Sequence, residues 1–315
     1  MYRSTLQREK RLAELKKEVN RRGFDRHASV LRDVSELPAE LQSQALADLS
    51  SHEAILTIVA FPPQIQRGWN YVPRQALLFT ATGVIHILAS IWPGEEPQTT
   101  SIMGRDLLSL RVTLVLLYGF IEMIAQGENA PMRVGMEFNT VAWPCLSTPV
   151  RQLLQMTTRC TTAVVEPLAY EAAMQQSLDD LPLKFSNGAK IHGRLPGQSI
   201  ETLSFQPSVQ KPWLHFLRRK MWANTLLMLT TDFMVIIQEE LNVEQGWVLT
   251  YIPRECIIEI QNHPRESWNE LALCLQREDQ TVTHIIRLGS DAARNWQARW
   301  IQHGGRWRER STELL

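Results

Sequence analysis

The feature that most constrains the fold is an order of turn residues, aromatic residues and hydrophobic runs that occurs twice along the chain. The tripeptide Glu36-Leu37-Pro38 is matched 144 residues later by Asp180-Leu181-Pro182. The same spacing separates three further residues, Phe61, Pro63 and Trp69, from their matches Phe205, Pro207 and Trp213. Few matched residues are identical, but a duplicated domain is expected to keep its order of signals. The sequence therefore predicts two copies of one fold.

The later part of each predicted copy repeats at a spacing of 149 residues. The matched residues are Leu77, Leu78, Thr82, Ile87 and Arg105 with Leu226, Leu227, Thr231, Ile236 and Arg254. A five-residue insertion near Trp213 reconciles the two spacings. We therefore expect an N-terminal helical arm at 1–50, domain 1 at 51–157, a connecting helix and loop at 158–195, domain 2 at 196–303 and a tail at 304–315.

Hydrophobic patterning predicts mostly strands within both copies. Runs of β-branched and large apolar residues alternate with turn residues, at 54–61, 76–89, 106–117 and 119–125 and again at 200–205, 225–238, 247–252, 256–261, 270–276 and 281–288. Each copy is expected to close with a helix, at about 148–157 and from Ser290 onward, where Ala293, Trp296 and Trp300 share one face. The expected fold class is α+β, with two bent β-barrels each closed by a C-terminal helix.

Segments outside the two copies carry predictions of their own. Residues 4–31 read as a helix with Leu12, Leu15 and Val19 on one face and a break at 20–23 before a second helical turn. Residues 1–32 hold ten Lys or Arg against four Asp or Glu. This excess favours a solvated helix docked by one face or a dimerisation element, with a contact to acidic lipid or RNA as the alternative. Residues 166–178 predict a helix, and residues 186–197 predict a mobile loop.

Composition limits the classes of partner. Lys plus Arg and Asp plus Glu both number 33, so no net charge draws the chain to nucleic acid. The charged N-terminus lacks the apolar core of a signal peptide, and the apolar stretch 112–121 is too short for a spanning helix. We expect a cytoplasmic protein without a transmembrane segment or a nucleic-acid partner, with peripheral attachment to a membrane as the alternative. Homo-oligomerisation is left open.

Common catalytic motifs are missing from the sequence. GxSxG, GxxxxGK and HExxH do not occur, and no GxGxxG follows a strand. The four cysteines have no CxxC spacing, and no two of the eight histidines lie three or four residues apart, which argues against zinc. His86, between two isoleucines, is expected to face solvent or a hydrogen-bond partner. We predict a binding or scaffolding protein that is no enzyme and has no cofactor or metal; the alternative is an enzyme with a site assembled from remote residues.

Two stretches of the sequence share a pattern of strand, turn and strand. LLMLTTDFMVII at 226–237, followed by GWVLTYIPRECIIEI at 246–260, resembles the strand-turn-strand core of the pleckstrin-homology-like (PH-like) superfamily, which includes the GRAM and bacterial PH-like domains. LLFTATGVIHIL at 77–88 is the weaker counterpart and has Gly83 where the other has Asp232. Six or seven short strands followed by a helix with an inward tryptophan are also typical of this superfamily. The resemblance implies tandem PH-like domains that act as binding modules.

The candidate binding residues lie in WLHFLRRKMW at 213–222. Here Arg218, Arg219 and Lys220 lie between Trp213 and Trp222, in the expected connection between the first two strands of domain 2. Lipid-binding PH domains place basic side chains in that loop, so the resemblance implies an anionic lipid surface as a ligand. The alternative is an ordinary solvated turn beside inward-facing aromatic residues. GWNYVPRQ, from Gly68, is the weaker site in domain 1. A protein partner is the other expectation.

Overall fold

A computed structural model describes residues 5–22, 28–49, 54–66, 70–157, 168–196, 198–214, 217–240, 243–265 and 268–309. The chain divides into two compact units. Unit 1 consists of Met1–Arg105, Leu117–Phe120 and Val134–Thr157, and unit 2 of Asp106–Leu116, Ile121–Arg133 and Thr158–Leu315. Unit 2 therefore includes residues 106–116 and 121–133, which belong to the first predicted domain.

The first half of the chain runs from the N-terminal helix to a closing helix. In order, its elements are α1 (Thr5–Arg22), β1 (Ser29–Leu31), the 3-10 helix η1 (Val34–Glu36), α2 (Ala39–Asp48), β2 (Ile55–Phe61), β3 (Gln64–Gln66), β4 (Asn70–Val72), β5 (Gln75–Thr80), β6 (Gly83–Leu88), β7 (Gln98–Met103), η2 (Gly104–Asp106), β8 (Leu107–Val115), β9 (Tyr118–Ala125), β10 (Met132–Phe138), η3 (Thr140–Ala142) and α3 (Trp143–Thr157). The predicted break at 20–23 agrees with the end of α1 at Arg22, but the prediction of further helix up to residue 31 is wrong, because residues 29–31 form a strand paired with β2.

The second half repeats this order from α5 onward. Its elements are α4 (Leu168–Asp179), α5 (Leu183–His192), β11 (Ile200–Gln206), β12 (Val209–Leu214), β13 (Leu217–Trp222), β14 (Thr225–Thr230), β15 (Phe233–Glu240), β16 (Val243–Pro253), η4 (Arg254–Cys256), β17 (Ile257–Pro264), β18 (Trp268–Arg277), β19 (Gln280–Gly289), α6 (Ser290–Gln302) and β20 (Trp307–Glu309). The first repeat thus runs from α2 to α3, and the second from α5 to α6.

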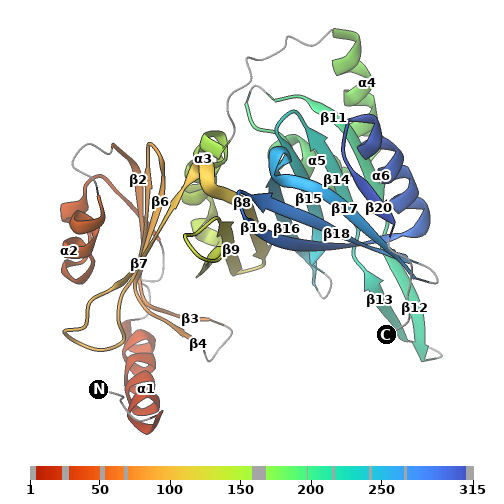
Figure 1. The fold of residues 1–315 in the computed structure, drawn as a ribbon. Helices are drawn as coiled ribbons and strands as arrows, with labels where there is room; N and C mark the ends of the chain where they lie inside the picture. Colours follow the sequence, from red (N-terminus) through yellow and green to blue (C-terminus); the bar gives the residue numbers. More distant parts are fainter. Residues whose placement is uncertain are drawn as a thin grey trace. The chain divides into compact units, whose positions relative to one another are not determined.

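The predicted class α+β is confirmed, but the predicted barrels are wrong. The described strands form a five-stranded sheet β1-β2-β5-β6-β7, a seven-stranded sheet β10-β9-β8-β16-β15-β14-β11, a four-stranded sheet β19-β18-β17-β20, and the hairpins β3–β4 and β12–β13 (Figure 1). All of these sheets are open, because the chain leaves one sheet at η2 and at η4 and continues in another. β7 and β8 are therefore not paired with each other, and neither are β16 and β17.

Hydrogen bonds at equivalent places in the two halves correct the predicted spacing of the later part. The N–H of Gly83 donates to Thr80 Oγ1 at 3.1 Å, and the N–H of Phe233 donates to Thr230 Oγ1 at 3.0 Å. These pairs set a spacing of 150 residues for the later part of the repeat, one more than predicted. Thr82 is therefore the counterpart of Asp232, and Gly83 is that of Phe233. The error has a physical reason: β5 and β14 are buried at every residue, so no alternation marks their faces.

The helices show where turn residues misled the prediction. The predicted loop at 186–197 is wrong in its first part, because α5 continues to His192. Phe185 and Ala189 are buried one helical turn apart on α5, as Leu41 and Ala45 are on α2, 144 residues earlier. The closing helix α3 begins at Trp143, five residues before the predicted start, and includes Pro149.

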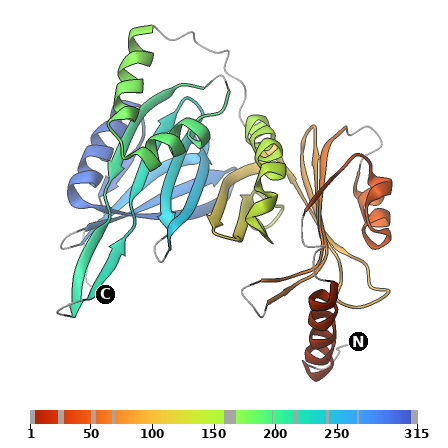
Figure 2. The same cartoon turned by 180° about the vertical axis from the view of Figure 1, so that it is seen from behind.

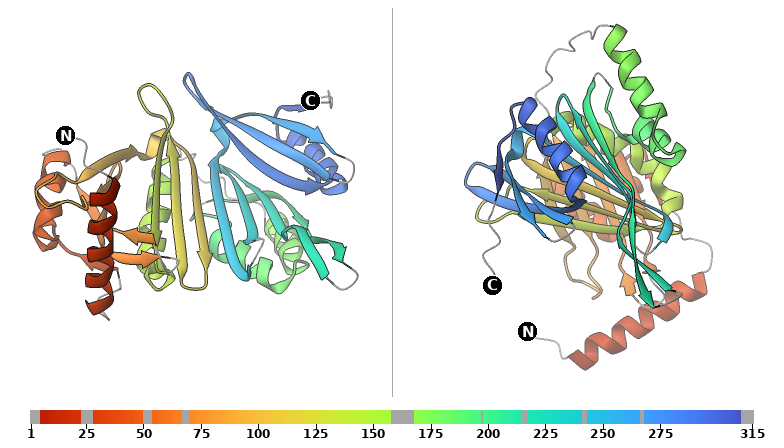
Figure 3. Two further views of the ribbon diagram at one scale, coloured as in Figure 1. Left: turned by 90° about the horizontal axis from the view of Figure 1, so that it is seen from below. Right: turned by 90° about the vertical axis from the view of Figure 1, so that its right-hand side faces the viewer.

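A separate hydrophobic core supports each unit. In unit 1, α2 covers one face of the five-stranded sheet (Figure 2). Leu41 of α2 belongs to the same buried cluster as Ile58 and Leu78 of that sheet. In unit 2, α6 packs Trp296 and Trp300 against the strands β14 to β19 (Figure 3). The predicted inward face of α6 is confirmed, since Ala293, Trp296 and Trp300 are all buried.

Candidate functional site

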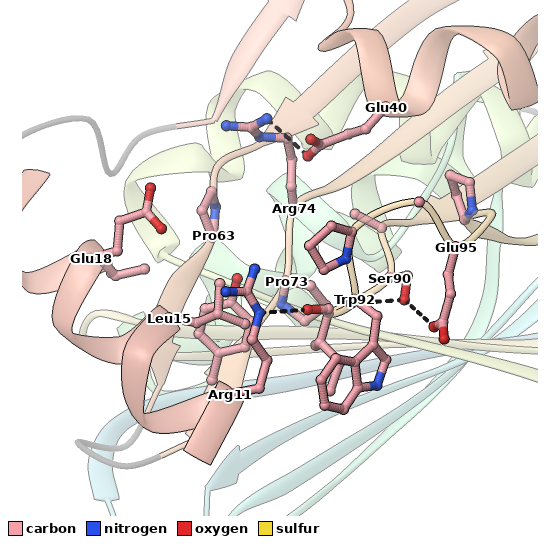
Figure 4. Close-up of a pocket in the computed structure, with 17 residues that line it drawn as sticks. Arg11, Leu15, Glu18, Glu40, Pro63, Pro73, Arg74, Ser90, Trp92 and Glu95 are labelled. Atoms are coloured by element: carbon pink, nitrogen blue, oxygen red, sulfur yellow. Dashed lines mark hydrogen bonds and ion pairs between the residues drawn. The ribbon is translucent and has the colours of Figure 1, made fainter. Parts of the chain in front are cut away.

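A surface pocket of about 310 Å³ in unit 1 is the candidate site (Figure 4). Its walls come from α1, which contributes Arg11 and Glu18, from β4, which contributes Tyr71, and from the loop 89–97, which contributes Trp92. Arg74, just before β5, completes the lining used in the argument below. All of these residues belong to unit 1.

Internal hydrogen bonds fix the loop that carries Trp92. Ser90 Oγ accepts from the N–H of Trp92 at 3.1 Å and donates to Glu95 Oε2 at 2.8 Å. Gly94 has φ 76°, a left-handed conformation that glycine adopts without steric cost, so the chain can turn directly after Pro93. The indole therefore stands on a loop with a defined shape and not on a plain strand connection.

Arg11 ties α1 to the same loop. Its Nε donates to the Ile91 carbonyl at 3.1 Å, and its Nη1 forms an ion pair with Glu14 at 3.4 Å. These two contacts use two of the five N–H groups of the guanidinium. The side chain is 29% exposed, so the group can still donate to a ligand in the pocket.

Arg74 ties the start of β5 to α2. Its Nη1 pairs with Glu40 at 2.9 Å. In the second repeat Lys184 of α5 stands at the position equivalent to Glu40, and its Nζ pairs with Glu239 of β15 at 3.0 Å. The counterpart of Arg74 is Asn224, so both repeats have an ion pair from this helix to a strand, but the strand partner stands at a different position in each.

Tyr71 lies between the charged groups of the pocket. Burial raises the pKa of its hydroxyl, the carboxylates of Glu18 and Glu40 raise it further, and Arg11 and Arg74 oppose them. The phenol therefore stays neutral at physiological pH and can donate or accept a hydrogen bond.

The lining as a whole suits recognition. Two aromatic rings stand beside rigid proline walls, Pro63, Pro73, Pro93 and Pro97. Such surfaces lose little conformational entropy when a ligand binds. The guanidinium groups add directed donors. In the described part of the chain, no group of three or more His, Cys, Asp or Glu is arranged to hold a metal ion.

The basic residues predicted as a ligand site lie on a strand and not in a turn. Arg218, Arg219 and Lys220 belong to β13, whose backbone pairs with β12 in a hairpin of unit 2 (Figure 3). The side chains of these three residues and of Trp213 lie outside the described ones. Trp222 is described: it is 7% exposed, and its ring centroid lies 6.5 Å from that of Trp268. Trp222 therefore packs in the interior.

The pocket residues gave only weak signals in the sequence. Tyr71 and Arg74 lie in GWNYVPRQ, the weaker predicted site, and Trp92 precedes PGEE, which reads as a plain turn. Arg11 and Glu18 are charged residues of an ordinary amphipathic helix. Their meeting depends on the docking of α1 beside the β3–β4 hairpin and the loop 89–97, which residue patterns do not encode.

The structure also bears on the predictions for His86 and for membrane-spanning helices, and it describes three of the four cysteines. His86 Nε2 is within 3.2 Å of Gln75 Oε1, so the expected hydrogen-bond partner is present. Cys145, Cys256 and Cys274 are free thiols, while Cys160 lies outside the described residues. Within the described ranges, no helix is both long and apolar enough to cross a membrane.

No protein-family model matches this chain, and no curated protein matches it either.

Proposed function

We propose that this chain is a non-catalytic binding protein built from two tandem PH-like repeats. The support is the element order that occurs twice: seven main strands with a hairpin inserted after the first, then one closing helix. A 3-10 turn, η2 or η4, divides each repeat into four strands and then three. The number of main strands and the closing helix match the layout that the sequence resemblance implies. A cytoplasmic location belongs to the same proposal.

The pocket of unit 1 is the proposed binding site, and a short peptide segment of a partner protein is the proposed ligand. The observation that carries this proposal is the placement of Trp92 and Tyr71 beside Arg11 and Arg74 on elements fixed by hydrogen bonds. A volume of about 310 Å³ is enough for a few side chains.

The charges of the pocket select the chemistry of that segment. Arg11 and Arg74 can each donate to a carboxylate, and Trp92 offers an apolar face. Glu18, Glu40 and Glu95 also line the pocket, so a polyphosphorylated headgroup would meet repulsion. We therefore propose a peptide with one acidic residue next to apolar or aromatic residues.

A displayed library of random twelve-residue peptides tests this proposal. The full chain is panned, and enriched peptides are measured by fluorescence anisotropy against the wild type, Arg11→Ala and Trp92→Ala. We expect each variant to weaken binding by about tenfold or more, equivalent to about 1.4 kcal/mol. Arg8→Ala is the matched control, because Arg8 is exposed on α1 and does not line the pocket. Peptides that bind all four proteins equally would refute the site.

A second candidate function is binding to anionic lipid through the β12–β13 hairpin. The backbone register places Lys211 opposite Arg219. The backbone of this hairpin therefore carries basic residues on both strands, and an anionic surface attracts such a local excess of positive charge. This register adds Lys211 to the three cations predicted from the sequence.

Co-sedimentation with phosphatidylserine vesicles at low salt tests this candidate. The wild type is compared with a variant in which Arg218, Arg219 and Lys220 are all replaced by Ala. We expect the variant to lose most of the bound fraction, because each cation near an anionic surface contributes about 1 kcal/mol. Equal binding by both proteins, or binding by neither, would remove the candidate.

A further inference from the structure

β16 lies inside the seven-stranded sheet because a strand of the first repeat pairs with it. It pairs antiparallel with β8, from Trp247 opposite Leu114 to Tyr251 opposite Leu110, and both strands lie in unit 2. β8, a strand of the first repeat, therefore pairs with the outer edge of β16, the fourth main strand of the second repeat. This pairing is an interface between repeats that the molecule already uses.

The counterpart of β16 in the first repeat is β7, and it is an edge strand. Among the described strands, β7 pairs with β6 alone. The N–H of Gly104 donates to the Thr82 carbonyl at 2.8 Å. Because hydrogen bonding alternates along an antiparallel pair, the N–H groups of Thr99 and Ser101 point away from β6. β7 thus offers an edge of the kind that β16 offers to β8.

The counterpart of β8 in the second repeat is β17, whose outer edge is covered. The C-terminal strand β20 pairs with it in parallel, Ile260 opposite Trp307 and Asn262 opposite Glu309. Residues 260–262 are the counterparts of residues 110–112, which hold β16. β20 therefore pairs with the part of β17 that corresponds to the part of β8 paired with β16 (Figure 1).

A few contacts hold β20 in place. The N–H of Ile260 donates to the Arg306 carbonyl at 3.0 Å, and Trp300 Nε1 donates to the same oxygen at 3.0 Å. Asn262 Nδ2 donates to the Glu309 carboxylate at 2.9 Å. A strand of three residues forms few ladder hydrogen bonds, so it is easily displaced compared with the longer pairing of β8 and β16.

We propose that β20 is a removable cap, and that the chain with β20 displaced assembles head to tail through β17 of one copy and β7 of the next. The new pair repeats the internal pairing of β8 with β16. The two edges come from different parts of the chain, so the contact is heterologous. One end of the assembly therefore keeps an unpaired β17 edge and the other an unpaired β7 edge. The inference goes beyond the proposed function and does not depend on the pocket.

Sedimentation velocity of the full chain over a range of concentrations tests the cap. In a parallel ladder the hydrogen bonds flank the paired residue, so the bond from Ile260 to Arg306 directs the N–H of Arg308 toward β17. Arg308→Pro removes this donor, and Arg308→Ala keeps it. We expect the weight-average mass of the proline variant to rise with concentration to about twice that of wild type or more, and the alanine variant to match wild type.

A substitution in β7 tests whether β17, once β20 is displaced, pairs with β7 of another copy. Thr99→Pro removes an outward N–H from β7 without loss of a bond to β6, and Thr99→Val keeps the N–H. Combined with Arg308→Pro, we expect Thr99→Pro to restore the wild-type mass and Thr99→Val to leave the assembly intact.

A chain that ends at Gly305 lacks β20 and covers the case in which Arg308→Pro leaves β20 bound to β17. Circular dichroism checks that each variant is folded. If both the proline variant and the shortened chain keep the wild-type mass, the cap has no role in assembly. If assemblies form and Thr99→Pro leaves them intact, β7 is not the partner edge. Either result overturns the inference.

Discussion

At the scale of single residues, His86 links burial to acid sensitivity. The side chain is 7% exposed, and burial lowers its pKa from 6.5 to about 4. The unfolded chain therefore takes up a proton near pH 6.5, while the folded chain resists it to about pH 4. Stability from this group is present above the unfolded pKa and is lost as the pH falls between these values.

We predict that the free energy of unfolding falls by about 2 kcal/mol more in wild type than in His86→Gln between about pH 7 and about pH 5. Urea denaturation of both proteins at both pH values measures this difference. Burial also lowers the pKa of His284 to about 4, but that residue is present in both proteins, so its contribution cancels. Parallel losses of stability would contradict the assignment.

Single residues were predictable where one environment dominates. The buried face of α6 is predictable from the sequence, because the apolar residues Ala293, Trp296 and Trp300 recur at helical spacing on one face. Trp222 is a candidate ligand contact in the sequence, with an inward-facing ring as the alternative, and its packing against Trp268 supports the alternative. Tyr71 and Trp92 were not singled out, because their role depends on α1, which is remote from both in sequence.

At the scale of elements, one threonine fixes the tight turn of the central hairpin in each repeat. Thr230 is fully buried, and its hydroxyl accepts from the N–H of Phe233 at 3.0 Å. We predict that Thr230→Val destabilises the chain by about 1–3 kcal/mol, because a buried N–H loses its partner. Thr80→Val in the first repeat is expected to act in the same direction.

Thermal and urea unfolding of these variants check the prediction, with Thr281→Val on β19 as the control. Thr281 is exposed, so its change is expected to stay within about 0.5 kcal/mol. A Thr230→Val protein as stable as the control would show that the hydroxyl does not fix the turn.

Elements were predictable where hydrophobic periodicity was strong, and less so elsewhere. The segment SNGAKIHGRLPG is rich in turn residues, yet its first part is helical because Phe185 and Ala189 of α5 bury one face in unit 2. Tertiary packing outweighs local preference there. The repeat itself contained the correction, since Leu181-Pro182 precedes α5 as Leu37-Pro38 precedes α2.

At the scale of the whole molecule, the pairing of β8 with β16 lies beyond sequence patterns. Both strands read as buried apolar runs, and such runs do not specify which neighbour each strand takes. The predicted domains therefore followed the repeat, while unit 2 also includes residues 106–116 and 121–133 of the first copy.

This pairing leads to a prediction about a cut chain. We expect a protein with a protease site inserted within residues 160–166 to stay in one piece after cleavage, because β8 and β16 remain hydrogen-bonded over five residue pairs. Gln280 adds a contact by accepting from the N–H of Gly127 at 3.0 Å. Size-exclusion chromatography of cut and uncut protein should give one elution volume, and only in denaturant should the cut protein elute later, as fragments of about half the length of the chain. Separation under native conditions would mean that the ladder between β8 and β16 is too weak to hold the fragments together. The proposed pairing of β17 with β7, which is argued from that ladder, would then lose its support.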